Sequence, residues 1–137
     1  MDGGEGRAYL CVKAGSLPFF IPVDRIKSVL SAQSLRARGD VDGALRLSRL
    51  LDVPAETTED YALDIRVPAG RFFVLVEEVL NPIRLKPEDV LPVPVRVLCP
   101  ENAFLAGIYA LPGCGEAGYL LDMERLLAKT DEEREQG

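Results

Sequence analysis

Apolar and polar residues alternate along several short stretches of this chain. The clearest stretch is YALDIRV, in which every second residue from Tyr61 to Val67 is apolar and the residues between them are smaller or charged. Because successive side chains of a strand point to opposite faces, this pattern predicts a strand. RAYLCVK (7–13) alternates in a similar way, and the apolar run RFFVLVEEV (71–79) follows a PAG turn. We therefore expect 7–13 to be a first strand and 71–79 to run back along 61–67 as another.

Other stretches predict turns, loops and short helices. Pro18 and Pro22 bracket the apolar piece in PFFIPVDRIKSVL, and we expect that piece at a strand end or a sheet edge because proline donates no ladder hydrogen bond. Residues 31–43 resemble a polar loop, and residues 45–54 carry leucines at helical spacing. Asp122 is well placed as the N-cap of a short C-terminal helix, MERLLAK.

Short strands separated by Gly and Pro turns predict a small all-β barrel fold. Gly107 lies inside the apolar stretch FLAGIYAL, which indicates a bulge or a close backbone approach. KPEDV (86–90) reads as a proline-led turn. The residues that we assign to the core are Leu63, Ile65, Phe73, Leu75, Ile108 and Leu121.

Composition narrows the class of protein. The chain has 137 residues, of which 47% are hydrophobic and 28% charged, as in an ordinary soluble domain. Its net charge of −6 argues against nucleic acid as a partner. No apolar run approaches the roughly 20 residues that span a bilayer, and no signal peptide is visible, so we expect a cytoplasmic protein without membrane insertion. Cys11, Cys99 and Cys114 are widely spaced, which favours a reducing compartment.

The candidate chemistry is sparse. The chain contains no histidine, which removes the commonest general base and metal ligand, and we expect no enzyme activity, cofactor or metal. Glu77 and Glu78 are adjacent on an expected strand, so their side chains should point to opposite faces and cannot converge on one bond as a glycosidase pair does. GCGEAG (113–118) matches a dinucleotide fingerprint, but a strand, not a helix, is expected after it.

Over about residues 8–128 the order of these pieces resembles the CheW-like domain, the coupling module of bacterial chemotaxis. The pieces that carry the resemblance are FFIPVDRIKSVL, then Arg38-Gly39 with Val41, Leu47, Leu50 and Leu51, then RFFVLVEEVLNPIRLKPEDVLPVP, FLAGIYAL and YLLDMERLL. The resemblance implies two small SH3-like β-barrels with a hydrophobic core between them and a short C-terminal helix. Residues 1–7 would be a flexible N-terminus and residues 129–137 a disordered charged tail.

The resemblance also implies a function. A CheW-like domain would be a non-enzymatic adaptor that binds the cytoplasmic tip of a chemoreceptor, the regulatory domain of a CheA-type histidine kinase, or both. On that basis we assign partner binding to Arg38, Arg46, Val29, Leu30, Val79 and Leu80. Arg38 matches the arginine of the family motif, and the four apolar residues would line a groove between the barrels.

Two departures from the family pattern change the expectation. Seven residues (31–37) separate Leu30 from Arg38, fewer than the pattern requires, which predicts a shortened first barrel. Arg46 stands where the family usually has Asp, which reverses a charge near the partner-contacting surface. We therefore expect a divergent member that serves one partner rather than two. An exposed edge strand left by the shortened segment would favour a homodimer.

Two other classes of function stay open. One is a sensor that binds a small molecule or a peptide in the groove between the barrels, for which ligand-induced thermal stabilisation without a kinase would be evidence. The other is a small enzyme that uses carboxylates with Ser or Cys, for which a pocket holding a carboxylate of strongly raised pKa would be evidence.

Overall fold

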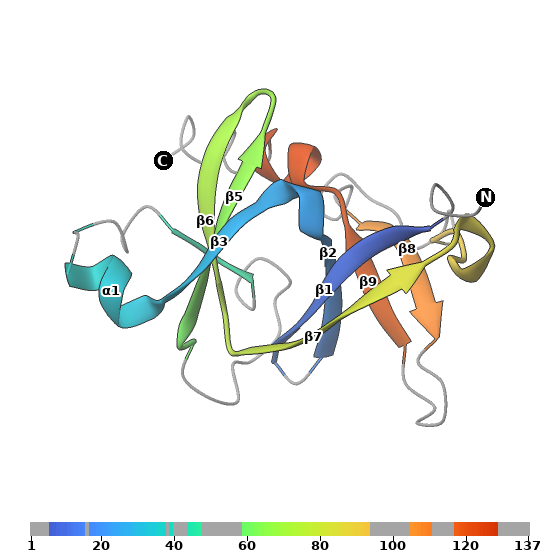
Figure 1. The fold of residues 1–137 in the computed structure, drawn as a ribbon, viewed down its shortest axis with the longest axis horizontal. Helices are drawn as coiled ribbons and strands as arrows, with labels where there is room; N and C mark the ends of the chain where they lie inside the picture. Colours follow the sequence, from blue (N-terminus) through green and yellow to red (C-terminus); the bar gives the residue numbers. More distant parts are fainter. Residues whose placement is uncertain are drawn as a thin grey trace.

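The computed structural model describes residues 6–15, 17–37, 39, 44–47, 59–93, 105–110 and 117–128, and the chain forms two β-sheets (Figure 1). The strands are β1 (Arg7–Ala14), β2 (Leu17–Pro22), β3 (Ile26–Ser31), β4 (Leu45–Arg46), β5 (Tyr61–Val67), β6 (Gly70–Val76), β7 (Glu78–Leu85), β8 (Leu105–Ala110) and β9 (Ala117–Leu121). A helix α1 (Ala32–Ala37), two 3-10 turns, η1 (Val23–Arg25) and η3 (Pro87–Asp89), and a helical stretch at 123–128 complete the described elements.

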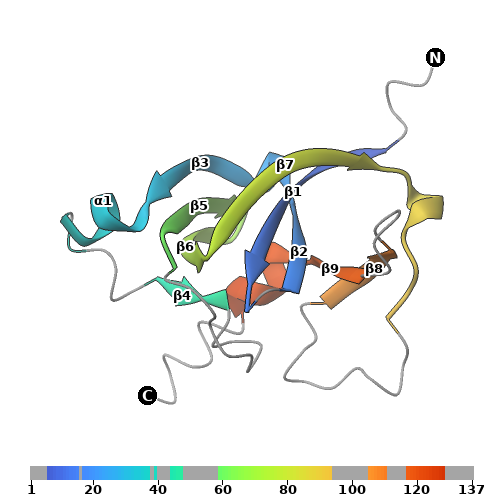
Figure 2. The same cartoon turned by 90° about the horizontal axis from the view of Figure 1, so that it is seen from below.

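Each sheet forms the basis of one subdomain. Sheet A has the strand order β7-β1-β2-β9-β8, and sheet B has the order β3-β5-β6-β4. Neighbouring strands are antiparallel except for the β2/β9 and β4/β6 pairs, which are parallel. Sheet B and α1 occupy one half of the molecule and sheet A the other (Figures 1 and 2). The predicted all-β fold with two subdomains is confirmed.

The main hydrophobic core lies between the two sheets. Its strands each contribute the side chains of one face, and the helical stretch at 123–128 closes it from one end. The buried members are Val12, Ala14, Phe19, Ile21, Leu47, Leu63, Ile65, Val67, Phe72, Val74, Val76, Leu121, Met123, Leu126 and Leu127. This set contains most of the fully buried large side chains, so packing between the sheets is the main source of the stability of the fold.

Two smaller clusters lie on the outer faces of the sheets. Cys11, Phe20, Leu85 and Leu120 pack together on the outer face of sheet A. Because β2 is buried on both faces, its sequence is a continuous apolar run bracketed by Pro18 and Pro22 rather than an alternating one. The two prolines do lie at the ends of the strand, but β2 itself is central in sheet A, between β1 and β9.

The third cluster corrects the prediction of a polar loop over 31–43. Residues 32–37 form α1, which lays Ala32 and Leu35 against Ala62 and Leu75 on the outer face of sheet B. Residues three apart on a helix share a face, so these two side chains are the apolar side of a single helical turn. α1 covers Ala62 on this face, and Asp64 on the same face is also buried, so β5 is buried on both sides from Ala62 to Ile65, where alternation had predicted one buried face.

Other predictions for this region have mixed outcomes. The helix expected over 45–54 is wrong at its start, because Leu45–Arg46 is strand β4, drawn into sheet B by parallel pairing with β6. Leu47 is helical, and residues 48–54 lie outside the described part of the chain, as do Cys99, Cys114 and the charged tail. Leu63, Ile65, Leu75 and Leu121 are buried as predicted.

The core assignment of Ile108 is wrong, and that of Phe73 holds only in part. Ile108 is half-buried, because β8 is an edge strand of sheet A and the residue faces the connecting segment through a bridge with Leu91. Phe73 is half-buried at the border of the cluster under α1. Gly107 is confirmed as a place of close approach, since a Cβ there would lie 2.4 Å from the Cγ1 of Val90.

Candidate functional site

The adjacent carboxylates Glu77 and Glu78 lie where the chain passes from one sheet to the other. The stretch 71–79, predicted as one strand, is divided at Glu77: β6 ends in sheet B and β7 begins in sheet A (Figure 1). The side chain of Glu77 is 8% exposed and accepts a hydrogen bond from the backbone amide of Gly15. Its own amide donates to the carbonyl of Lys13 at 2.9 Å. Glu78 is exposed, so the two carboxylates have different surroundings, but Glu77 lies at the bend between the strands and not on a strand as predicted.

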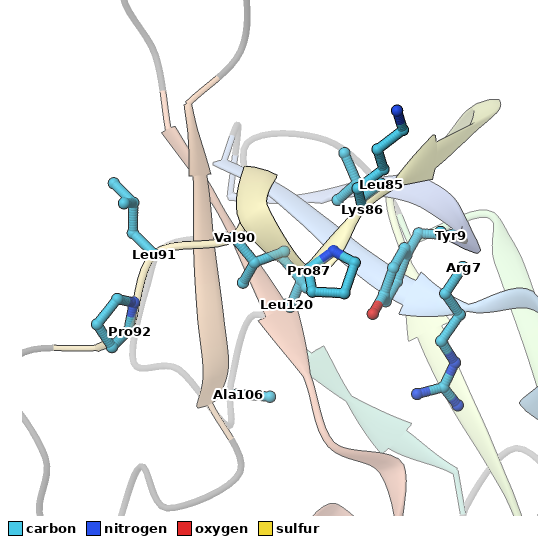
Figure 3. Close-up of a pocket in the computed structure, with 11 residues that line it drawn as sticks. Arg7, Tyr9, Leu85, Lys86, Pro87, Val90, Leu91, Pro92, Ala106 and Leu120 are labelled. Carbon is cyan, nitrogen blue, oxygen red and sulfur yellow. The ribbon is translucent and has the colours of Figure 1, made fainter. Parts of the chain in front are cut away.

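A cavity of about 600 Å³ lies on sheet A. Its apolar wall combines Tyr9 from β1, Leu85 at the end of β7, Pro87 from η3, Val90 from the following segment and Leu120 from β9 (Figure 3). Leu85 and Leu120 also belong to the outer cluster of sheet A, so the floor of the cavity is that cluster. The described residues that line it all come from sheet A and its connecting segments, so they form no groove between the sheets.

The walls of this cavity are held in place by specific contacts. The backbones of Leu91 and Ile108 exchange two hydrogen bonds of 2.8 Å, which fix the segment after η3 to β8. The absence of a side chain at Gly107 lets Val90 approach β8 closely. At the start of η3 the amide of Lys86 donates to the Asp89 carboxylate at 2.9 Å. The cavity is therefore preformed, as small-molecule sites usually are.

One end of the cavity is polar. Arg7 lies there beside Tyr9, with its guanidinium 5.9 Å from the centre of the Tyr9 ring (Figure 3). Nη2 of Arg7 donates to Asp24 at 2.9 Å, and this hydrogen bond raises the pKa of Arg7, so the cation is permanent. A second cavity of about 150 Å³ continues from the same end and contains the ion pair between Arg25 and Glu124.

Predicted partner-binding residues lie in both subdomains. Arg38 lies outside the described residues. Arg46 is exposed on β4, with its guanidinium 3.9 Å from the Glu59 carboxylate. Val29, on the edge strand β3, is 44% exposed. Leu30 is half-buried and packs against the cluster under α1.

Val79 and Leu80 lie on β7, in the other sheet. Val79 packs against the main core, and Leu80 packs against the outer cluster of sheet A. The four apolar candidates therefore have different surroundings, and Val29 offers the most exposed surface among them. Partner binding by any of the six residues stays a prediction.

Sequence reasoning did not find a group of charges on the outer face of sheet B. Arg66 and Arg71 stand directly opposite each other at the end of the β5–β6 hairpin. Both lie near the buried carboxylate of Asp64, at 3.3 Å and 3.7 Å. Like charges in opposed positions repel, and the shared carboxylate offsets that repulsion. Alternation along 61–67 placed Asp64 and Arg66 on one face of the strand. Only the pairing register of the β5–β6 hairpin shows that Arg71 lies beside them.

The remaining chemical candidates have structural surroundings. Asp122 caps the helical stretch that follows it, accepting hydrogen bonds from the amides of Glu124 at 3.0 Å and Arg125 at 3.2 Å, which confirms the predicted N-cap. Gly118 lies within strand β9, against the outer cluster of sheet A. A strand, and not a helix, therefore follows the glycines of GCGEAG, as predicted. Burial raises the pKa of the Cys11 thiol. Among the described residues, no cluster of potential metal ligands and no helix long and apolar enough to cross a membrane is found.

Comparison with known proteins identifies the arrangement of the two sheets. No protein-family model matches the sequence, and no curated protein matches it. A solved structure, the scaffolding protein TtCheW from Thermoanaerobacter tengcongensis, superposes with a TM-score of 0.64 over 85% of this chain and 88% of that one. The chain has a CheW-like fold. The two sequences are 8% identical, so the likeness establishes the fold and does not transfer the role of any residue.

Proposed function

We propose that this protein is a cytoplasmic, non-enzymatic adaptor of a bacterial chemosensory system. It binds the cytoplasmic tip of a chemoreceptor, the regulatory domain of a CheA-type histidine kinase, or both. The observation that carries this proposal is the CheW-like fold, which extends over most of the chain and most of a protein described as a scaffolding protein. The resemblance of the sequence pieces, in the same order along the chain, supports the same conclusion.

The surroundings of the carboxylates agree with a binding role. Glu77 bonds to the backbone of the β1–β2 turn, Asp64 lies between two arginines, and Asp122 caps a helix. Each of these side chains stabilises the fold through the contacts it makes. Binding a protein partner needs exposed surface, and Arg46 and Val29 supply a cation and an apolar side chain on sheet B.

A pair of titrations tests the proposal. Isothermal calorimetry would measure binding of the full chain to the kinase regulatory domain and, separately, to the receptor tip of the same organism. Binding to both partners makes the protein a coupling adaptor, and binding to one makes it a divergent adaptor that serves that partner alone. If neither partner binds at concentrations up to the hundred-micromolar range, the proposed function is wrong and only the fold remains.

Variants locate the surface once binding is found. Val29→Glu places a charge on the exposed edge strand, and Arg46→Ala removes the cation of β4. Arg125→Ala is the matched control for Arg46→Ala, because Arg125 is also exposed and its guanidinium also lies within 4 Å of a carboxylate, that of Asp122. We expect about a tenfold loss of affinity for Val29→Glu, as for a contact near the centre of an interface. Loss of binding in Arg125→Ala alone would move the surface away from sheet B.

Edge strand β3 also underlies the proposed homodimer. Among described strands it pairs on one side with β5, and its outward residues include Val29. Sedimentation equilibrium of the wild type and of Val29→Glu tests this directly. A dimer that Val29→Glu converts to monomer supports association through β3, and a wild type that stays monomeric at high concentration rules it out.

A further inference from the structure

We propose that the cavity on sheet A binds a small amphipathic carboxylate, with its apolar body against Tyr9, Pro87 and Leu120 and its carboxylate at Arg7. None of the described candidate partner-binding residues lines this cavity, although Leu80 packs against the same outer cluster of sheet A, and the proposal does not depend on the adaptor function. The shared chemistry is an apolar chain or ring that ends in one carboxylate. A free carboxylate and the C-terminus of a peptide both have it.

The size and the walls of the cavity suit such a ligand. A volume of about 600 Å³ lies within the range of about 300–1,000 Å³ that is typical of small-molecule sites. The aromatic ring of Tyr9 and the pyrrolidine ring of Pro87 face the same space, with Val90 and Leu120 beside them (Figure 3). These rigid side chains lose little conformational freedom when a ligand covers them, so burying apolar ligand surface there is favourable.

The charge of the lining selects the sign of the ligand. Among the described residues that line the cavity, Arg7 and Lys86 are cationic and none is acidic, although the chain as a whole carries a net charge of −6. Asp122 and Glu124 line only the smaller adjoining cavity, where Glu124 is paired with Arg25. Figure 3 shows the hydroxyl of Tyr9 on the same side as the guanidinium of Arg7, whereas the ammonium of Lys86 points the other way. An anionic head group therefore has two donors at one end of the cavity, and Lys86 contributes mainly its aliphatic stem.

Asp24 limits the strength of this contact. Its carboxylate accepts from Nη2 of Arg7 at 2.9 Å, so part of the positive charge of Arg7 is already balanced. Arginine has five N–H donors, and the bond to Asp24 uses those of a single nitrogen, so a second carboxylate can bind on another edge of the guanidinium. The side chain of Arg7 is 47% exposed, so the preference for an anion is expected to be modest.

The first experiment is a titration of the isotope-labelled full chain by two-dimensional NMR with three probes that share one chain: octanoate, octanol and octylammonium. We expect saturable shifts at the amides of Tyr9, Leu85, Val90 and Leu120. Octanoate should bind about fivefold more tightly than octanol, the size of effect given by one half-exposed ion pair. Octylammonium should bind most weakly. Equal binding of octylammonium and octanoate, or shifts confined to other surfaces, would overturn the proposal.

Variants test the direction of the charge contact. Arg7→Gln and Lys86→Gln each remove one cation from the lining, but only Arg7 lies at the polar end. Arg7→Gln should abolish the preference of octanoate over octanol, and Lys86→Gln should leave most of it. Asp24→Asn removes the competing carboxylate and should tighten octanoate binding about threefold, as expected for an exposed ion pair. Equal effects of the two Gln variants would contradict a directed contact.

A matched pair of alanines tests the position of the ligand. Ala106 lines the cavity and Ala110 does not, and both are exposed on β8. Ala106→Phe should block octanoate binding, and Ala110→Phe should not. If Ala106→Phe loses its folded NMR spectrum, Arg7→Gln decides the question, because Arg7 is half-exposed. A final arm compares a short peptide that ends in Leu with its C-terminal amide: tighter binding of the peptide acid than of octanoate names a peptide C-terminus as the source.

Discussion

The adjacent residues Glu77 and Glu78 provide a stability test with an internal control. Glu77→Ala removes the carboxylate that accepts from the amide of Gly15, in the turn between β1 and β2. Glu77 is 8% exposed, and Gly15 has a positive φ of 59°, a backbone conformation that favours glycine in this turn. Hydrogen bonds to a charged group contribute roughly 1.5–3 kcal/mol, and a donor left without a partner costs a similar amount. We expect Glu77→Ala to lower the free energy of unfolding by about 2 kcal/mol.

The other variants divide this effect into its parts. Glu77→Gln keeps a neutral acceptor at the same place and should lose about half as much, because charge-assisted hydrogen bonds are roughly twice as strong as neutral ones. Glu78→Ala removes an exposed carboxylate that stands opposite Lys13, so it should cost at most about 0.5 kcal/mol. Urea titration followed by circular dichroism measures all three values. Equal losses in Glu77→Ala and Glu78→Ala would refute a structural role for the buried carboxylate at the junction.

Three further outcomes follow from burial. Leu75→Asp places a charge in the cluster under α1, where Leu75 is 2% exposed, and circular dichroism should show an unfolded chain. Gly118→Ala brings a Cβ to 2.4 Å from Cε2 of Phe20 and 3.0 Å from the Pro18 carbonyl oxygen. The urea midpoint should therefore fall by the equivalent of about 1–3 kcal/mol. An unchanged midpoint would show that Phe20 can move aside. Burial raises the pKa of Cys11. Its alkylation by iodoacetamide at pH 8 should therefore be slower than that of a free thiol, and it should accelerate as the pH rises. Peptide mass spectrometry measures the rate.

Local patterns in the sequence predicted the strands better than their surroundings. The alternation in 61–67 is that of β5, but it could not show that α1 would cover Ala62 on the second face, or that Asp64 would be buried beside Arg66 and Arg71. The signal for α1 is a single apolar pair, Ala32 and Leu35, which is too short to stand out among polar residues. Gly107 and the Asp122 cap were predictable, because a close approach and a helix start each leave a residue-level signature.

The passage of the chain between the sheets had no such signature. Both sides of Glu77 are extended and apolar, so the sequence reads as one strand, although its two halves pair with different partners. The cavity on sheet A could not be predicted from the sequence either. Tyr9, Pro87 and Leu120 are far apart in the sequence, and the strand order of sheet A brings them together. Features that depend on which strands pair at long range cannot be predicted from local periodicity.

The two proposed sites should act independently. Coupling between distant sites requires an element with two arrangements whose equilibrium both ligands change. The path from the cavity to sheet B runs along the β1–β7 ladder to the junction, where the backbone of Glu77 is bonded to β1 and its side chain to the β1–β2 turn. We infer from these contacts that the ladder keeps the same arrangement when the cavity is filled. Saturating octanoate should therefore leave the affinity for the kinase domain or the receptor tip unchanged within about twofold. Because linkage is reciprocal, a larger change in either titration would require a second arrangement of the junction.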